Sequence, residues 1–192
     1  MEVKKAVLER RSYRKFLDKK VSEEDIRQIV EAGLWAPSAT NIQPWYYVAV
    51  SRDEAVEEIR DIASDGVEAF RPVLEERFSE HPEVVRNTTS FIATLGGAPF
   101  ILLAFARLKG GENDMKTVQG IAAGIENMIL AALEKDIRSC WLTSLCSGKA
   151  AERLHERFAP ERGGLVALVA FGYSTQEPRA PKRKEDRAEF LL

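Results

Sequence analysis

Apolar residues recur at helical spacing in several stretches of the chain, most clearly over residues 114–135. This stretch carries a broad apolar stripe, so the pattern predicts a long, well-packed helix. Gly120 and Gly124 lie four residues apart on it and indicate that another backbone comes close. That neighbour belongs either to the core of the same chain or to a second copy across a dimer interface. The stripe consists of Val118, Ile121, Ala122, Ile125, Met128, Ile129, Ala132 and Leu133.

Three short runs are apolar without alternation, which is typical of strands buried on both faces. They cover residues 99–106, 139–145 and 165–171, and residues 45–50 predict a further strand. Strands separated by helices of unequal length favour an α+β fold, in which a sheet is layered with helices. With no repeat or long linker, we expect one domain over residues 1–192.

Weaker helical patterns fill most of the remaining chain. Ser22-Glu23-Glu24-Asp25 resembles a capping box and predicts that a helix begins there and stops before Pro37. Two charged, solvent-facing helices are expected over residues 53–63 and 66–78. Three more helices are predicted over residues 2–10, 86–95 and 149–158.

Two of the segments without a helical or strand pattern have distinctive residues. Residues 37–44 form a polar loop with a proline at each end, which stiffens its backbone. The polar tail ends in Phe190-Leu191-Leu192, and we expect these apolar residues to dock on a surface.

Composition excludes several classes of protein. The formal net charge of −2 gives no bulk field for a polyanion, and the longest apolar run, 98–106, is about half of a membrane span. We expect no signal peptide, and two cysteines favour the reducing cytoplasm over a disulfide framework. Cys140 and Cys146 are interpreted as buried, inert thiols, and with two histidines in the chain a zinc site is improbable. Glycine-rich phosphate loops and a serine nucleophile elbow are also missing.

The charge is unevenly placed along the chain. Residues 10–20 carry six basic side chains against one acidic, and residues 179–187 carry five against two. Between them, residues 52–80 hold ten acidic and four basic side chains.

Two segments offer binding chemistry. Arg10, Arg11, Ser12 and Arg14 could give several hydrogen bonds to a phosphate, although a solvated basic helix end explains them too. Asn41 and Gln43 in the loop suit the edge of a heterocycle, although a structural turn is the commoner explanation.

Taken together, the two segments are more specific. R-R-S-x-R followed about 23 residues later by P-S-x-x-N-x-Q-P-W resembles the nitroreductase-like family of FMN-dependent oxidoreductases. Further landmarks stand in the family's order along most of the chain, and residues 52–90 are least similar. These landmarks are 127–132 (NMILAA), 139–142 (SCWL), 170–173 (AFGY) and the basic segment 181–184 (PKRK).

The resemblance implies a homodimer of intertwined α+β subunits, each with a mainly antiparallel sheet wrapped by helices, and FMN at the subunit interface. Arg10, Arg11, Ser12 and Arg14 would hold the phosphate and the pyrimidine edge. Arg183, with Lys182 or Lys184 beside it, would also meet the phosphate. The flavin ring would meet Pro37, Ser38, Ala39, Asn41 and Gln43, some from the partner subunit, and Leu142, Thr143 and Ser144. The family often has glycine or glutamate at the position of Thr143, which leaves the contact at N5 open.

The same resemblance implies the activity. NADH or NADPH would reduce the flavin in a ping-pong reaction, and a nitroaromatic, quinone or enone would then take the hydride. No side chain is assigned a catalytic role, since the flavin carries the chemistry.

Two alternatives belong to other classes. A nucleic-acid binder would use residues 10–20 with Tyr13, Phe16, Trp45 and Tyr46 as stacking aromatics, but the net charge and the acidic middle argue against it. A flavin-binding module of the same fold could instead sense or store FMN, or use it in a specialised reaction.

Overall fold

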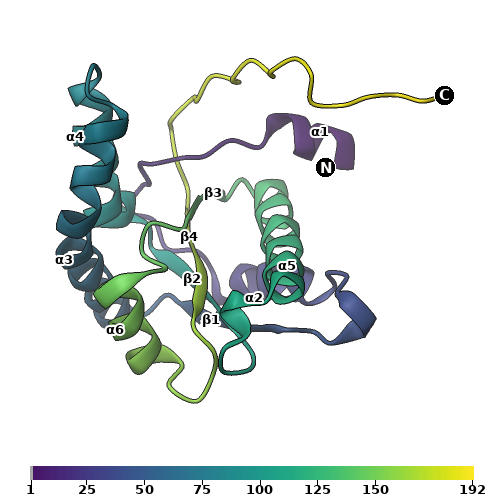
Figure 1. Cartoon of the computed structure of the whole chain (residues 1–192), viewed down its shortest axis with the longest axis horizontal. Coiled ribbons are helices and arrows are strands. Elements are labelled where there is room, and N and C mark those ends of the chain that lie inside the picture. The colour runs from purple at the N-terminus through teal and green to yellow at the C-terminus, as the bar shows by residue number, and fades with distance from the viewer. Residues whose placement is uncertain (1) are drawn as a thin grey trace.

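A computed structural model describes residues 2–192 and contains a four-stranded sheet between helices (Figure 1). The strand order is β1-β2-β4-β3, and all neighbouring strands are antiparallel. The strands are β1 (Trp45–Val50), β2 (Phe100–Ala106), β3 (Arg138–Leu142) and β4 (Leu165–Gly172). The helices are α1 (Val3–Glu9), α2 (Glu23–Leu34), α3 (Asp53–Arg77), α4 (Pro82–Thr94), α5 (Met115–Glu134) and α6 (Gly148–Phe158).

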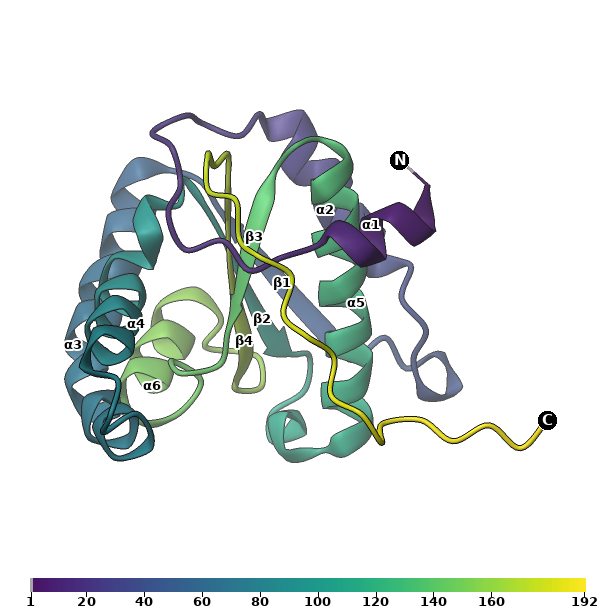
Figure 2. The ribbon, with the colours of Figure 1, turned by 90° about the horizontal axis from the view of Figure 1, so that it is seen from above.

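Helices cover both faces of the sheet. α2 and α5 pack on one face, and α3, α4 and α6 lie on the other (Figure 2). β2 lies in the middle of the sheet and all seven of its residues are buried, as its unbroken apolar run predicts. Its side chains alternate between the two cores, so that Leu103 faces α3 and Leu102 faces α5. The α+β prediction is therefore confirmed.

The two helices that support the candidate segments have well-formed N-termini. The Ser22 hydroxyl accepts a hydrogen bond from the Asp25 amide at 3.1 Å, which confirms the predicted start of α2. Asp114 caps α5 by accepting from the Thr117 amide at 3.0 Å. Hydrogen bonds from Thr117 hold the pKa of the Asp114 carboxyl below its usual range.

The region of residues 53–78 differs from the sequence prediction. Instead of two solvent-facing helices, α3 is one helix whose apolar side is buried, with Ile59 and Ala63 fully covered. Gly66 does not end the helix, because it is the point where α3 meets α6. A Cβ placed on Gly66 would lie 2.8 Å from the Ala150 Cβ. Pro72 also lies inside the helix, so tertiary packing outweighs both helix-breaking signals.

The glycines of α5 serve packing within the chain. A Cβ on Gly120 would lie 3.0 Å from Pro44 Cγ, and one on Gly124 would lie 2.1 Å from Tyr47 Oη. Of the two interpretations that the sequence leaves open, the structure thus supports close approach inside the subunit. Tyr47 Oη is buried without a hydrogen-bond partner among residues 2–192, and this burial raises the pKa of Tyr47.

The C-terminal tail first contacts residues 14–17 through Tyr173, Ser174 and Gln176, and its end extends beyond α1 (Figure 1). Phe190, Leu191 and Leu192 are almost fully exposed, so the expected docking does not occur within this chain. No helix among residues 2–192 combines the length and the apolar character that crossing a membrane requires.

Candidate functional site

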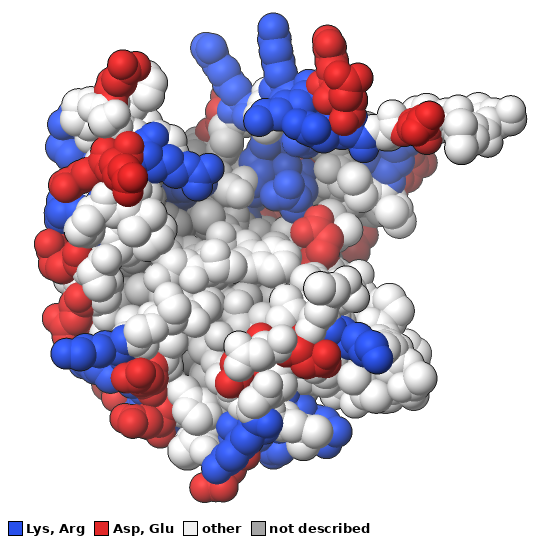
Figure 3. Space-filling view, in the orientation of Figure 1, with Lys and Arg blue, Asp and Glu red and all other residues white. Residues whose placement is uncertain are grey.

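The basic N-terminal segment (residues 10–20) lies along β3, which is an edge strand of the sheet. Ser12 forms an isolated parallel bridge with Ser139, and the Tyr13 amide donates to the Ser139 carbonyl at 2.9 Å. The segment therefore covers the exposed edge of β3 and satisfies part of its backbone. This pairing sets the basic side chains beside one end of the sheet, where Lys and Arg gather around the N-terminal segment and the tail (Figure 3).

Three of the four predicted residues in this segment influence the pKa of one thiol. Burial raises the pKa of Cys140, while Arg14, a hydrogen bond from Ser12, and Arg10 act in the opposite direction. Arg10 also approaches Glu126 of α5 at 3.5 Å. Arg11 is directed elsewhere, because its Nη1 donates to the carbonyl oxygens of Leu8, at 2.8 Å, and of Arg10. Arg11 thus binds the last carbonyls of α1, whereas Arg10 is directed to α5 and Arg14 to the face of α4.

A cavity of about 1020 Å³ opens beside this group. Ser12, Arg14 and Lys15 form one wall, and the first residues of the tail, from Gln176 to Pro178, form another. The Arg14 guanidinium lies 5.9 Å from the ring centre of Phe91 across the cavity. The opposite wall consists of Phe78, Val84, Asn87, Thr88, Ser90, Phe91 and Thr94, from α4 and its approach.

The wall formed by α4 is the part of the site that the motifs did not predict. Val84, Asn87, Thr88 and Phe91 lie three or four residues apart, so they share one face of the helix. This mixed polar and apolar spacing is the signal that could have identified them. On this face Phe91 is buried in the wall of the cavity, Thr88 is half-buried and Asn87 is exposed.

The polar loop has an unusual backbone. Thr40, Asn41 and Gln43 all have positive φ, at 48°, 57° and 46°, a conformation that costs energy for residues other than glycine. The Gln43 amide donates to Ser38 Oγ at 3.0 Å, and Gln43 Nε2 donates to Asn41 Oδ1 at 3.3 Å. Ser38 is half-buried, while the side chains of Pro37, Ala39, Asn41 and Gln43 are exposed.

Within one chain the loop and the basic segment do not meet. The loop packs on α5 at Gly120, whereas Arg10 reaches α5 at Glu126. No hydrogen bond or ion pair joins the two segments among the described residues. Asn41 and Gln43 line a separate cavity of about 560 Å³ with Tyr46, Tyr47 and Arg107.

The remaining predicted residues lie in two places. Leu142 ends β3 and is buried in the core, Thr143 is exposed and Ser144 is half-buried. Lys182, Arg183 and Lys184 are exposed on the tail and have no hydrogen bond or ion pair within residues 2–192. The first part of the tail crosses the basic segment, and the part with these three cations continues away from it (Figure 2).

Of the two cysteines interpreted as buried thiols, Cys140 is buried, whereas Cys146 is half-buried. Both are free, and burial raises the pKa of Cys146 to about 12. Among residues 2–192 no group of three or more Cys, His, Asp or Glu side chains could hold a metal ion.

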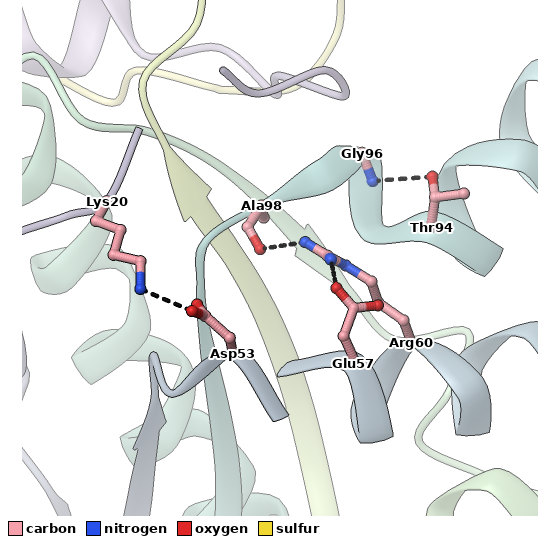
Figure 4. Close-up of polar contacts among 7 residues, drawn as sticks. All are labelled: Lys20, Asp53, Glu57, Arg60, Thr94, Gly96 and Ala98. Atoms are coloured by element: carbon pink, nitrogen blue, oxygen red, sulfur yellow. Dashed lines mark hydrogen bonds and ion pairs between the residues drawn. The ribbon is translucent and has the colours of Figure 1, made fainter. Parts of the chain in front are cut away.

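The turn that connects α4 to β2, residues 95–98, contacts the basic segment. The Phe16 amide donates to the Gly96 carbonyl at 2.8 Å. Thr94 Oγ1 accepts from the Gly96 amide at 3.2 Å, and Arg60 Nη2 of α3 donates to the Ala98 carbonyl at 3.0 Å (Figure 4). Arg60 also pairs with Glu57.

The segment is also tied to the start of α3, where Lys20 Nζ lies 2.7 Å from Asp53 Oδ2 (Figure 4). This ion pair and a hydrogen bond with Asp53 raise the pKa of Lys20. Both partners are exposed, so the pair orients the segment more than it stabilises the fold.

Known proteins resemble the chain over most of its length. The model of the nitroreductase family matches residues 7–173. A Methanothermobacter thermautotrophicus protein, whose name joins NADH dehydrogenase and NAD(P)H nitroreductase, is 39% identical over 93% of this chain and 80% of its own. A Thermus thermophilus protein named NADH dehydrogenase is 31% identical over 92% of this chain and 89% of its own.

Solved structures share the fold. The crystal structure of a BluB-like flavoprotein from Clostridium difficile is 26% identical, with a TM-score of 0.78 and complete coverage of both chains. The crystal structure of a nitroreductase with bound FMN from Bacteroides fragilis has a TM-score of 0.77 at 23% identity, again over both whole chains.

Gly96 is where the turn touches the basic segment, and its substitution tests that contact. A Cβ on Gly96, whose φ is 64°, would lie 2.5 Å from the Arg14 carbonyl oxygen. We expect Gly96→Ala to lower the free energy of unfolding by about 2–4 kcal/mol, through backbone strain together with this clash. Urea unfolding measures the change.

Gly148→Ala is the matched control. Gly148 has nearly the same φ, 65°, but nothing lies within 4 Å of the added Cβ. Gly148→Ala should therefore lower the free energy of unfolding only through backbone strain, by about 1 kcal/mol. Equal losses in the two variants would show that the contact between Gly96 and Arg14 contributes nothing.

Proposed function

Because the chain belongs to the nitroreductase family, we propose that it is an FMN-dependent NAD(P)H oxidoreductase with a ping-pong reaction. The observation that carries the proposal is a cavity large enough for a flavin that Ser12 and Arg14 line, with Arg10 nearby on the same segment. The reductant would bind, leave, and be replaced in the same cavity by a nitroaromatic, quinone or enone.

The residues present fit the phosphate of FMN. A phosphate dianion needs several strong donors, and guanidinium groups match its geometry. Arg14 has no ion pair among the described residues, and Arg10 has only its 3.5 Å approach to Glu126. Both guanidiniums, with the Ser12 hydroxyl, therefore have donors to offer a ligand. On the tail, we propose Arg183 as a further cation, with Lys182 or Lys184 beside it.

The opposite wall fits a flat heterocycle. The amide of Asn87 and the hydroxyl of Thr88 can pair with ring carbonyls and nitrogens, and Phe78, Val84 and Phe91 offer apolar contact. These apolar side chains exclude water from the surface on which nicotinamide and acceptor would lie. Thr143 and Ser144, at the end of β3, are proposed to border the ring. When bound, FMN would accept a hydride from NAD(P)H and donate it to the acceptor.

We also propose that the site is completed by a second copy in a homodimer. The exposed amides of Asn41 and Gln43 do not reach Arg14 in their own chain, so their role at the flavin needs a partner subunit. Apolar side chains exposed on the subunit support this assembly. Trp35 is 81% exposed, and Phe190, Leu191 and Leu192 at the end of the tail are largely exposed. The free thiols agree with the reducing cytoplasm that we propose as its location.

The phosphate assignment is tested by substituting the three arginines of the basic segment. Arg10→Ala and Arg14→Ala should each raise the Kd for FMN about 10- to 100-fold, because each removes a charged donor to the phosphate. Arg11→Ala should change it less than about twofold, since Arg11 binds the end of α1. Quenching of flavin fluorescence on titration measures all three. Equal affinities in all variants and the wild type would contradict the phosphate assignment.

The activity is tested by stopped-flow mixing of the FMN-loaded protein with NADH and with NADPH. A reductase should show rapid bleaching of the flavin absorbance with at least one of them. Recovery of the absorbance on later addition of a quinone should follow. A flavin sensor or store would keep its absorbance through the first mixing, which would overturn the proposed activity.

The homodimer is tested by sedimentation equilibrium of the full chain and of a variant that ends at residue 189. We expect the full chain to sediment at twice the subunit mass of 21.5 kDa. Loss of Phe190–Leu192 should weaken the association, because their apolar surface would no longer be buried. A monomer at all concentrations would contradict the shared site.

A further inference from the structure

The backbone of residues 13–17 is held from three directions. It belongs to neither a helix nor a regular strand, yet each of its five amides donates a hydrogen bond. Tyr13 donates to Ser139 of β3, Phe16 to Gly96 of the turn at 2.8 Å, and Leu17 to Tyr173 at 2.8 Å. The other two amides, those of Arg14 and Lys15, have a side chain as their acceptor.

That acceptor is Gln176. Its Oε1 accepts from the Arg14 amide at 2.8 Å and from the Lys15 amide at 2.9 Å. One oxygen therefore fixes two consecutive peptide groups, from a residue 162 positions away in the sequence. Because neither amide has another acceptor among residues 2–192, loss of this oxygen releases both at once.

Ser174 orders the same part of the tail. Its hydroxyl donates to the Lys15 carbonyl at 2.6 Å and accepts from the Gln176 amide at 3.2 Å. The start of the tail is thus folded onto the basic segment rather than passing over it. Gln176 consequently reaches the two amides from a backbone that is itself anchored.

An amide oxygen suits this position because it carries no charge. A carboxylate would bind the two amides more strongly but would also pair with Arg14 and Lys15 and weaken their field. With glutamine, the backbone is held while both cations keep their positive charge for a ligand. Gln176 also lines the cavity that Arg14 borders, so its two hydrogen bonds fix the backbone at the wall of the candidate site.

We propose that Gln176 is a positioning residue that fixes the backbone under Arg14 and thereby aims its guanidinium at the phosphate or ring edge of FMN. This inference rests on the proposed function, since it takes FMN as the ligand of the cavity. It assigns to Gln176 no contact with the reacting atoms. Gln176 affects FMN binding only by fixing the position of Arg14.

The test compares three variants of the full chain. Gln176→Leu removes the acceptor, and Gln176→Glu keeps an acceptor of the same shape. Gln28→Leu makes the same change as the first at an exposed position on α2, outside the candidate site. Two quantities are measured: hydrogen exchange at the amides of residues 14 and 15, and the Kd for FMN by fluorescence quenching.

For Gln176→Leu we expect exchange at these two amides to accelerate at least about tenfold, and the Kd for FMN to rise at least about tenfold, because two hydrogen bonds are lost. Gln176→Glu should exchange as slowly as the wild type. In high salt, which screens its added charge, its Kd should return to within about threefold of the wild type. Gln28→Leu should leave both quantities unchanged.

Two results would overturn the positioning role. In the first, the amides of Gln176→Leu exchange faster but the variant binds FMN as tightly as the wild type. The two hydrogen bonds to Gln176 would then order the backbone without affecting FMN binding. In the second, exchange in Gln176→Leu is unchanged, so these hydrogen bonds do not exist in solution. Failure of the wild type itself to bind FMN would instead refute the proposed function, and the exchange data would still report on the two hydrogen bonds.

Discussion

The hydrogen bond from the Tyr13 amide to the Ser139 carbonyl, 2.9 Å long, is the contact on which the site depends. It joins the basic N-terminal segment to the edge of β3, which would otherwise present unpaired backbone groups. From this contact the chain continues through Phe16, bonded to Gly96, and Leu17, bonded to Tyr173. Arg14 is therefore presented by a backbone with little freedom, although it belongs to no helix or strand.

The uneven charge of the sequence is partly neutralised by ion pairs in the folded chain. Part of the acidic middle pairs with basic residues of α6, as Asp65 does with Arg153 at 2.6 Å and Glu58 with Arg157 at 2.8 Å. These pairs are exposed and contribute little to stability, but they neutralise α3 locally. Among residues 2–192, by contrast, no acidic side chain forms an ion pair with Arg14 of the basic segment or with Arg183 of the tail. A small dianion accounts for this remainder better than a polyanion, which would require a wider basic surface.

The sequence predicted those elements whose signal is local. The runs 99–106 and 165–171 are buried strands, and Ser22 caps the expected helix, because these signals depend on a few adjacent residues. The run 139–145 also contains a strand, but β3 is an edge strand that ends at Leu142. The division of residues 53–78 was wrong, since the packing of Gly66 against α6 cannot be read from its neighbours along the chain. The motif also could not show that Arg11 turns to the end of α1 while Arg10 and Arg14 do not. Gln176 lies in a tail without periodicity, and only the folded chain brings it to Arg14.

The central claim is that Arg10, Ser12 and Arg14, with the wall formed by α4, hold FMN. The absorption spectrum of freshly purified protein tests it most directly, followed by heat release and chromatography of the chromophore. The account predicts a yellow flavin band and a released compound that migrates as FMN. A colourless protein that also fails to take up added FMN would contradict it.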